Sequence, residues 1–161
     1  MTDAPRKTGS RERVRAFLDA HDLTEGITEF EQSTKTAAEA AEAMGCELGQ
    51  IVKSLVVVAD GTPVLALVAG DRRGDLAAIA EEVGAVKAKM ADADTVRGAT
   101  GYAIGGVSPF DLPAELTVLI DDSLARFETV FPAAGTPTSM VRMSLHRLHE
   151  VVHGKVARIS H

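Results

Sequence analysis

The sequence predicts a single α/β domain in which helices and strands mix without a strict β–α–β alternation. Its 161 residues are 45% hydrophobic and 25% charged, the balance of one globular domain that can bury a core. A helix start signal, Thr36-Ala37-Ala38-Glu39, leads into an alanine-rich stretch that ends at Gly45. Two β-branched runs flank the turn residues Asp60-Gly61 and predict a hairpin.

The elements before the hairpin are short. Residues 1–10 are polar, and we expect them to be disordered, which leaves residues 11–161 as one domain. From Ser10 to Asp22, apolar side chains recur at helical spacing and predict a short amphipathic helix. The residues at that spacing are Val14, Phe17 and Leu18. Residues 26–30, GITEF, predict a strand before the capped helix.

The hairpin and the segments after it alternate between strand and helix patterns. Both hairpin strands are apolar on successive positions, so we expect the sheet to be covered on both faces. Gly84 and Gly101 end two helix patterns, and Asp122 or Ser123 can cap a third that runs through Phe127. In order, the sequence predicts the hairpin at 50–70, a helix at 75–84, a strand at 85–90, a helix at 92–101, strands at 115–121 and 138–143, and a terminal helix at 144–152.

Composition and charge exclude several classes of function. A net charge of −6 argues against a protein that coats DNA or duplex RNA, because such binding needs many cationic contacts to phosphates. No apolar run approaches the length of a membrane span, and the N-terminus lacks a secretory signal. The single cysteine, Cys46, excludes internal disulfides and fits a reducing compartment. We therefore expect a cytoplasmic protein that binds neither membrane nor DNA.

Two features are candidates for chemistry. Lys53 lies in the apolar strand IVKSLVVV, where a buried ammonium is costly unless an anion meets it. A lysine at the strand's edge that extends to water is the alternative. The segment GYAIGGVSPF supplies the second feature, because Gly105 and Gly106 can turn backbone N–H groups toward a carbonyl oxygen and its developing charge. A structural bend before an edge strand explains the same glycines.

Other polar residues have simpler explanations. Asp121 ends a predicted strand, where pocket residues often project, but it also suits the cap of the next helix. Three histidines share one face of the terminal helix, yet no thiol or carboxylate accompanies them, and we expect no metal. These histidines are His146, His149 and His153. Cys46 has no evident histidine partner, so we expect it to be a small buried hydrophobic residue rather than a nucleophile.

Four segments taken in order resemble the YbaK family, which includes the editing domain of bacterial prolyl-tRNA synthetase. The segments are TAAEAAEAMGCELGQIVKSLVVV, GYAIGGVSPF, TVLIDDS and FETVFPAAG. The resemblance covers residues 24–152, and the combination of VKSL with GGVSP is its most specific part. It implies a central, partly barrel-like mixed sheet flanked by helices. It also implies a hydrolase that removes wrongly attached amino acids from tRNA without a cofactor.

The resemblance also implies roles for individual residues. The lysine matching Lys53 approaches the phosphate at the tRNA's terminal adenosine, and the glycine matching Gly105 presents its backbone to the aminoacyl carbonyl. We expect catalysis to involve Lys53, Gly105 and Asp121. We expect the substrate to be bound by Phe30, Ser54, Gly106, Ser108, Ala133 and Gly135.

The substrate is not determined by this resemblance. The cysteine-specific branch of the family carries hydroxyls where Phe30 and Ala133 stand here. The sequence shows no obvious nucleophile of its own, so the attacking group is either part of the substrate or a positioned water. We expect tRNA for proline carrying a small wrong amino acid, contact confined to the acceptor end of the tRNA, a possible synthetase partner and a monomer. The alternative is a non-catalytic module that binds aminoacyl-tRNA or a synthetase.

Overall fold

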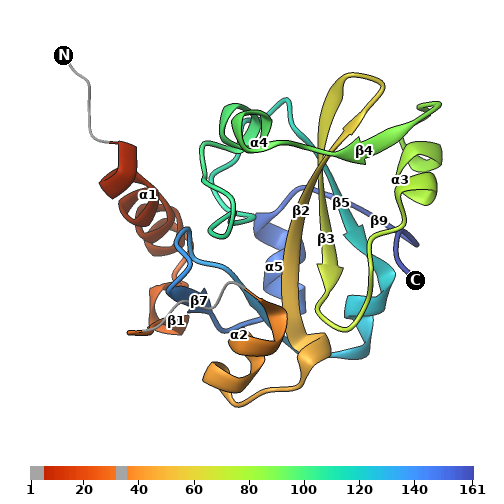
Figure 1. Cartoon of the computed structure of the whole chain (residues 1–161). Helices are drawn as coiled ribbons and strands as arrows, with labels where there is room; N and C mark the ends of the chain where they lie inside the picture. Colours follow the sequence, from red (N-terminus) through yellow and green to blue (C-terminus); the bar gives the residue numbers. More distant parts are fainter. Residues whose placement is uncertain (1–5, 32–35) are drawn as a thin grey trace.

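The computed structural model describes residues 6–31 and 36–161 and shows one mixed α/β domain (Figure 1). The helices are α1 (Arg6–Ala20), α2 (Ala37–Met44), α3 (Leu76–Glu82), α4 (Ala93–Thr100) and α5 (Leu145–Val151), with 3-10 turns η1 (Thr24–Gly26), η2 (Leu48–Gln50) and η3 (Asp122–Arg126). The strands are β1 (Ile27–Glu29), β2 (Ile51–Ala59), β3 (Thr62–Ala69), β4 (Ala88–Met90), β5 (Thr117–Asp121), β6 (Thr129–Pro132), β7 (Ser139–Val141), β8 (Met143–Ser144) and β9 (Lys155–Ala157).

The main sheet is mixed and curls into a half-barrel, which confirms the predicted fold class. Its strand order is β8-β6-β2-β3-β5-β9, and β4 pairs with β2 away from this path. β2 and β3 form the antiparallel hairpin, whereas β5 adds to β3 and β9 adds to β5 in parallel. A separate antiparallel pair joins β1 to β7.

The hairpin is covered on both faces, as the apolar run on each strand predicts. Successive side chains of a strand point to opposite faces, so β3 divides its residues between two cores. Leu65 and Leu67 pack in the larger core, with side chains from α1, α4 and α5. Val64 and Val68 pack in the smaller core, which α3 covers through Ile79.

The edge of β2 that faces away from β3 is only partly paired, and this positions the site. β6 pairs with β2 at Ile51 and Val52, and β4 pairs with it from Val57 to Ala59. Residues 53–55 therefore have a partner strand on the β3 side only. A gap in the sheet is left beside Lys53, between two strands that are too short to meet.

Helix ends follow the predicted signals. Thr36 and Glu39 form the reciprocal capping box of α2, and Gly45 ends this helix with φ of 67°. Gly101 ends α4 in the same left-handed conformation, with φ of 82°. Glycine accepts this conformation without the steric penalty that a Cβ brings.

Several element boundaries were predicted wrongly. α1 begins at Arg6 rather than Ser10. The segment capped by Asp121, rather than by Asp122 or Ser123, is a 3-10 turn. The expected strand at 138–143 is divided at Arg142 into β7 and β8.

Two strands, β6 and β9, had no prediction, and both are formed by pairing with strands remote in sequence, β2 and β5. Residues 1–5, part of the segment expected to be disordered, lie outside the described residues. None of the helices in the described ranges has both the length and the apolar character needed to cross a bilayer.

Candidate active site

A cavity of about 210 Å³ lies at the gap in the edge of β2. It is formed by the first residues of α2, the start of β2, the glycine-rich loop after α4 and the segment after β6. Lys53, Ser54, Gly105 and Ala133, which are remote in sequence, are thereby brought together. The full lining is Thr36, Ala37, Ala40, Ile51, Val52, Lys53, Ser54, Leu55, Gly105, Val107, Ala133 and Met140.

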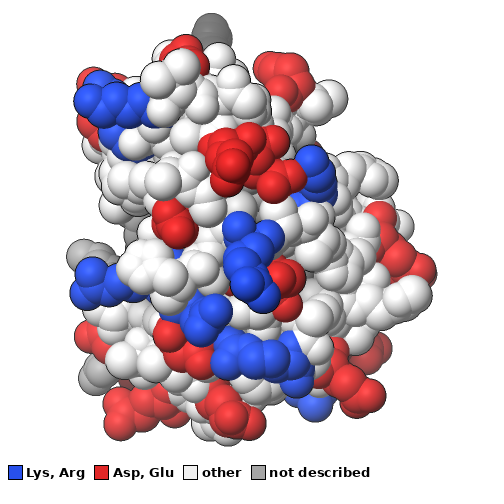
Figure 2. Space-filling view, turned by 90° about the vertical axis from the view of Figure 1, so that its right-hand side faces the viewer, with Lys and Arg blue, Asp and Glu red and all other residues white. Residues whose placement is uncertain are grey.

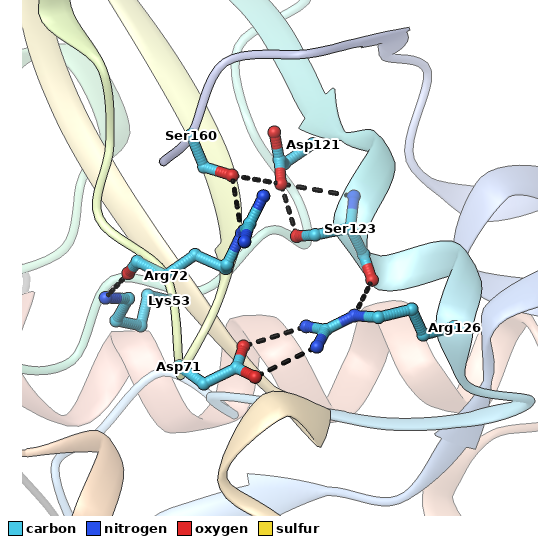
Figure 3. Close-up of polar contacts among 7 residues, drawn as sticks. All are labelled: Lys53, Asp71, Arg72, Asp121, Ser123, Arg126 and Ser160. Atoms are coloured by element: carbon cyan, nitrogen blue, oxygen red, sulfur yellow. Dashed lines mark hydrogen bonds and ion pairs between the residues drawn. The ribbon is translucent and has the colours of Figure 1, made fainter.

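Lys53 is half-buried and has no anionic partner in direct contact among the described residues (Figure 3). Its Nζ donates to the main-chain carbonyl of Arg72, in the loop after β3. The nearby carboxylate of Asp71 is held instead by Arg126, at 2.8 and 2.9 Å. Burial lowers the pKa of Lys53, attraction to Asp71 opposes that shift, and repulsion from Arg73 adds to it. The ammonium is thus desolvated and only partly satisfied.

Gly105 lies at the tip of the glycine-rich loop with φ of 95°, in the left-handed region that favours glycine. Its N–H donates to no acceptor among the residues that the structure describes. A Cβ placed there would meet only Cγ of Pro137, at 3.9 Å, so the space beside it is open. This backbone group is available to a ligand in the cavity.

Gly106 and Gly135 do not line the cavity but allow two loops to touch. The sequence predicts that the N–H of Gly106 turns toward a carbonyl oxygen of a ligand. In the structure this N–H donates instead to the carbonyl of Ala103, at 3.0 Å. A Cβ on Gly106 would lie 3.1 Å from the carbonyl oxygen of Gly135. Gly135 has φ of 98° and makes room for α1, because a Cβ there would meet Val14 at 2.8 Å.

Of the residues expected to bind the substrate, Ser54 and Ala133 line the cavity, whereas Phe30 does not. The Oγ of Ser54 is buried and has no hydrogen-bond partner among the described residues. An unsatisfied buried hydroxyl of this kind costs stability, which often marks a functional position. Phe30 packs with the buried residues Ile51 and Met140 and supports the cavity from outside.

Asp121, expected to take part in catalysis, and Ser108, expected to bind the substrate, are buried and are not among the residues that line the cavity. The carboxylate of Asp121 accepts from the Ser123 hydroxyl, the Ser160 hydroxyl at 2.7 Å and the Ile159 N–H at 2.8 Å. Burial alone would raise the pKa of Asp121, but these hydrogen bonds outweigh burial and lower it. The Ser108 hydroxyl accepts from the N–H of Phe110 at 3.3 Å. Both residues shape the fold around the site.

Figure 3 shows that Asp121 is connected to Lys53 through two intervening residues, Ser160 and Arg72. Ser160 donates to Asp121 and accepts from Nε of Arg72 at 3.4 Å, while the carbonyl of Arg72 accepts from Lys53. On the other side, Arg126 donates to the carbonyl of Ser123 at 2.7 Å and holds Asp71. The loop that meets Lys53 is therefore anchored from the end of β5.

Basic side chains gather on one face of this acidic protein. Figure 2 shows a band of Lys and Arg across the lower middle of the face on the side of α3 and the C-terminus in Figure 1. In the loop after β3, Arg72 and Arg73 form no ion pair within the described ranges. Two further arginines are paired, Arg126 with Asp71 and Arg158 with Asp122. The main-chain carbonyl of Arg72 accepts from Lys53, whereas its guanidinium points toward Ser160 (Figure 3).

The histidine face that the sequence raised for a metal does not persist. α5 ends at Val151, so His153 lies beyond the helix, and His146 contacts Glu150 at 3.3 Å. Within residues 6–31 and 36–161, no three His, Cys, Asp or Glu side chains are grouped to hold an ion.

Burial raises the pKa of Cys46, which disfavours a reactive thiolate.

Sequence reasoning missed the contribution of α2 to the cavity. Thr36, Ala37 and Ala40 line it from the first turn of that helix. The capping box predicts where α2 begins, but only the tertiary packing of α2 against β2 places this end beside Lys53. Met140 completes the apolar wall from β7.

The family model for the aminoacyl-tRNA editing domain matches residues 31–151. The uncharacterised YwhH of Bacillus subtilis is 38% identical over 148 residues, which cover 91% of this chain and 94% of that protein. ProXp-y of Escherichia coli, named a multifunctional Ser/Thr-tRNA deacylase, is 29% identical over 140 residues, which cover 84% of this chain and 83% of that protein.

A solved structure gives the same result for the fold. It is described as a candidate trans-editing enzyme for prolyl-tRNA synthetase and superposes with a TM-score of 0.86 at 35% identity. The match covers 99% of each chain. The matched segment contains α2, the β2–β3 hairpin and the glycine-rich loop that together form the cavity. The chain belongs to the aminoacyl-tRNA editing domain family.

Proposed function

We propose that this protein acts in trans on mischarged tRNA, most specifically tRNA for proline that carries a small wrong amino acid. Members of the editing-domain family are aminoacyl-tRNA deacylases, and the chain is a hydrolase of this class. The finer choice of tRNA is supported by the structural relative described as a candidate trans-editing enzyme for prolyl-tRNA synthetase.

One observation carries the proposal. The Lys53 ammonium and the free N–H of Gly105 line the same cavity. These two groups are far apart in the sequence, and neither needs the other to stabilise the fold. Their combination suits an aminoacyl ester at the end of a nucleic acid, which offers a phosphate to the first and a carbonyl oxygen to the second.

The size and lining of the cavity support a small amino acid. Pockets for drug-sized ligands occupy about 300–1,000 Å³, whereas this cavity has about 210 Å³. Most of the residues in its wall are apolar, and they include Ala37, Ala40, Ile51, Ala133 and Met140. A large side chain attached to the ester would have to displace these residues.

The chemistry follows from what the lining contains. Hydrolysis forms a bond from a water oxygen to the carbonyl carbon and breaks the ester bond to the ribose oxygen, which leaves free amino acid and uncharged tRNA. The Gly105 N–H stabilises the charge that develops on the carbonyl oxygen. The described lining offers no histidine, cysteine or carboxylate. The group that attacks the carbonyl carbon is therefore either a positioned water or part of the substrate itself.

Cations beside the cavity suit the phosphates of the acceptor end. Lys53 lines the cavity, and Arg73 lies close enough to lower the pKa of Lys53 by repulsion. Neither forms an ion pair in the described part of the chain. The net charge of −6 elsewhere disfavours a wide footprint on the tRNA. Contact with only the last nucleotides agrees with both observations.

Ser54→Ala is expected to lower turnover about 10-fold, the value of one hydrogen bond to the substrate. The melting temperature of the free protein should stay the same or rise, because the substitution removes a buried hydroxyl without a partner. Steady-state deacylation and thermal melting on one preparation measure both effects.

Ser123→Ala provides the matched control for stability. Its hydroxyl is also buried, but it donates to Asp121, so the melting temperature should fall. Unchanged turnover in Ser54→Ala would show that this hydroxyl does not contact the substrate.

A deacylation screen tests the proposal as a whole. The purified protein is incubated with tRNA for proline charged with alanine, cysteine, serine or threonine, and with each correctly charged tRNA as a control. We expect release of at least one small amino acid from tRNA for proline. Turnover with none of these substrates, together with binding of the aminoacyl-tRNA, would identify a non-catalytic module instead.

A further inference from the structure

Helix α1 holds the glycine-rich loop through a single arginine. Arg13 donates from Nε to the carboxylate of Asp111 at 2.9 Å and from Nη2 to the carbonyl of Asp111 at 2.5 Å. The remaining nitrogen, Nη1, lies 3.5 Å from the carbonyl of Gly101. One guanidinium therefore contacts both ends of the loop that runs from residue 101 to residue 111.

The same arginine covers a buried tyrosine within the loop. Its guanidinium carbon lies 4.6 Å from the centre of the Tyr102 ring. The Tyr102 hydroxyl donates to the carbonyl of Phe110 at 2.6 Å, which closes the loop a second time. Burial raises the pKa of Tyr102 to about 12, against a smaller opposing effect of Arg13, so the hydroxyl remains a donor. Phe17 of α1 packs on Phe110, with ring centres 5.5 Å apart.

Helix α1 also supports the second loop at the cavity. The space that Gly135 leaves open is filled by Val14 and by the carbonyl of Ser10. The carbonyl of Gly135 in turn lies against Gly106, next to Gly105. The two loops that bring Gly105 and Ala133 to the cavity thus rest on one helix.

We propose that α1 is a positioning element of the active site and that Arg13 is its principal positioning residue. Arg13 is not among the residues that line the cavity, so it acts by fixing where the loop carries the Gly105 N–H. α1 precedes residues 31–151, the segment that matches the family model. The inference rests on the proposed function, in which that N–H meets the ester carbonyl.

The chemistry of arginine explains why one residue can do this. A planar fork of donors can reach acceptors on two sides at fixed angles, whereas an ammonium has a single centre. An exposed ion pair to Asp111 alone would contribute little to stability. The contacts to main-chain carbonyls therefore add to the carboxylate contact in setting the position of the loop.

The test compares Arg13→Ala and Arg13→Lys with Arg15→Ala. Arg15 lies on the same helix, and its only ion pair among the described residues is with Glu29, at 3.7 Å. Its removal therefore makes the same change of charge away from the loop. We expect kcat to fall about 10- to 100-fold in Arg13→Ala, because small displacements of catalytic groups cost factors of this size. KM should change little, and lysine should not restore kcat. Arg15→Ala should match the unchanged protein.

Amide hydrogen exchange in residues 101–111 supplies a readout that does not depend on activity. Exchange should be faster in Arg13→Ala and unchanged in Arg15→Ala. If the wild-type protein deacylates none of the substrates, the proposed function fails. Amide exchange in residues 101–111 still tests whether the contacts of Arg13 hold the loop in place. Unchanged loop exchange in Arg13→Ala, unchanged kcat, or an effect on KM alone would each overturn the proposal.

A second variant covers the case in which Arg13→Ala does not fold. Asp111→Asn weakens the contact to Nε and leaves both carbonyl contacts in place. It should lower kcat less than about 10-fold and raise loop exchange moderately. If kcat and loop exchange both stay the same in Asp111→Asn, a positioning role for this contact is contradicted.

Discussion

Lys53→Ala is expected to abolish deacylation while leaving the fold intact. The ammonium is partly desolvated and meets only a carbonyl, so its removal takes away a group that the folded protein does not need. Loss of a cation that binds the substrate's phosphate removes both affinity and orientation. The measurement is turnover on the best substrate of the screen, with a thermal melt of the same sample.

The direction of the stability effect follows from the pKa. The pKa of Lys53 is lowered in the folded state, mainly by burial, so at any pH below both the folded and the unfolded pKa values, charging this group destabilises the fold by a constant amount. Stability should rise with pH only between the lowered pKa and the ordinary one near 10.5. Lys53→Ala removes that dependence, and its melting temperature at neutral pH should be unchanged or slightly higher.

Two comparisons separate a specific role of Lys53 from a loss of charge. Lys89→Ala removes an exposed lysine from β4, next to β2, and should leave turnover unchanged. Lys53→Arg should restore little activity, because a planar fork does not replace a compact ammonium in a small cavity. Full activity in Lys53→Ala would mean that this lysine merely extends to water at the sheet edge.

Gly105→Ala is expected to lower the rate about 10²- to 10³-fold, the usual cost of removing one donor to a developing oxyanion. The added methyl meets almost nothing in the free protein, where the nearest atom is Cγ of Pro137 at 3.9 Å. Its effect comes from the φ of 95°, which alanine adopts at a cost of about 1–2 kcal/mol. Relief of that strain rotates the N–H away from the cavity.

Because the positive φ also lowers stability, Gly105→Ala needs a control with the same strain. Gly61 has φ of 85° in the β2–β3 turn, and a Cβ there meets no atom within 4 Å. Gly61→Ala should lower the melting temperature by a similar amount and leave turnover unchanged. A rate loss in Gly105→Ala no larger than in Gly61→Ala would reduce the role of Gly105 to shaping the loop.

Much of the local structure is determined by the sequence alone. The capping box at Thr36, the turn at Asp60-Gly61 and the helix end at Gly101 depend on neighbours a few residues away, so their prediction is confirmed. The apolar runs of the hairpin predict a sheet buried on both faces for the same reason. The anomalies of Lys53 and the glycine-rich loop are also visible in the sequence, because each breaks a local rule.

Only the tertiary structure decides which of these residues meet. Ser54 and Ala133 reach the cavity, whereas Asp121 and Ser108 are buried elsewhere, because strand pairing and loop contacts connect residues that are far apart in sequence. The gap beside Lys53 exists because β4 and β6 are too short to cover the edge of β2, and no local pattern encodes the lengths of both. The arrangement of Arg13 around Asp111 has the same origin, since its two residues stand 98 positions apart and only packing of α1 brings them together.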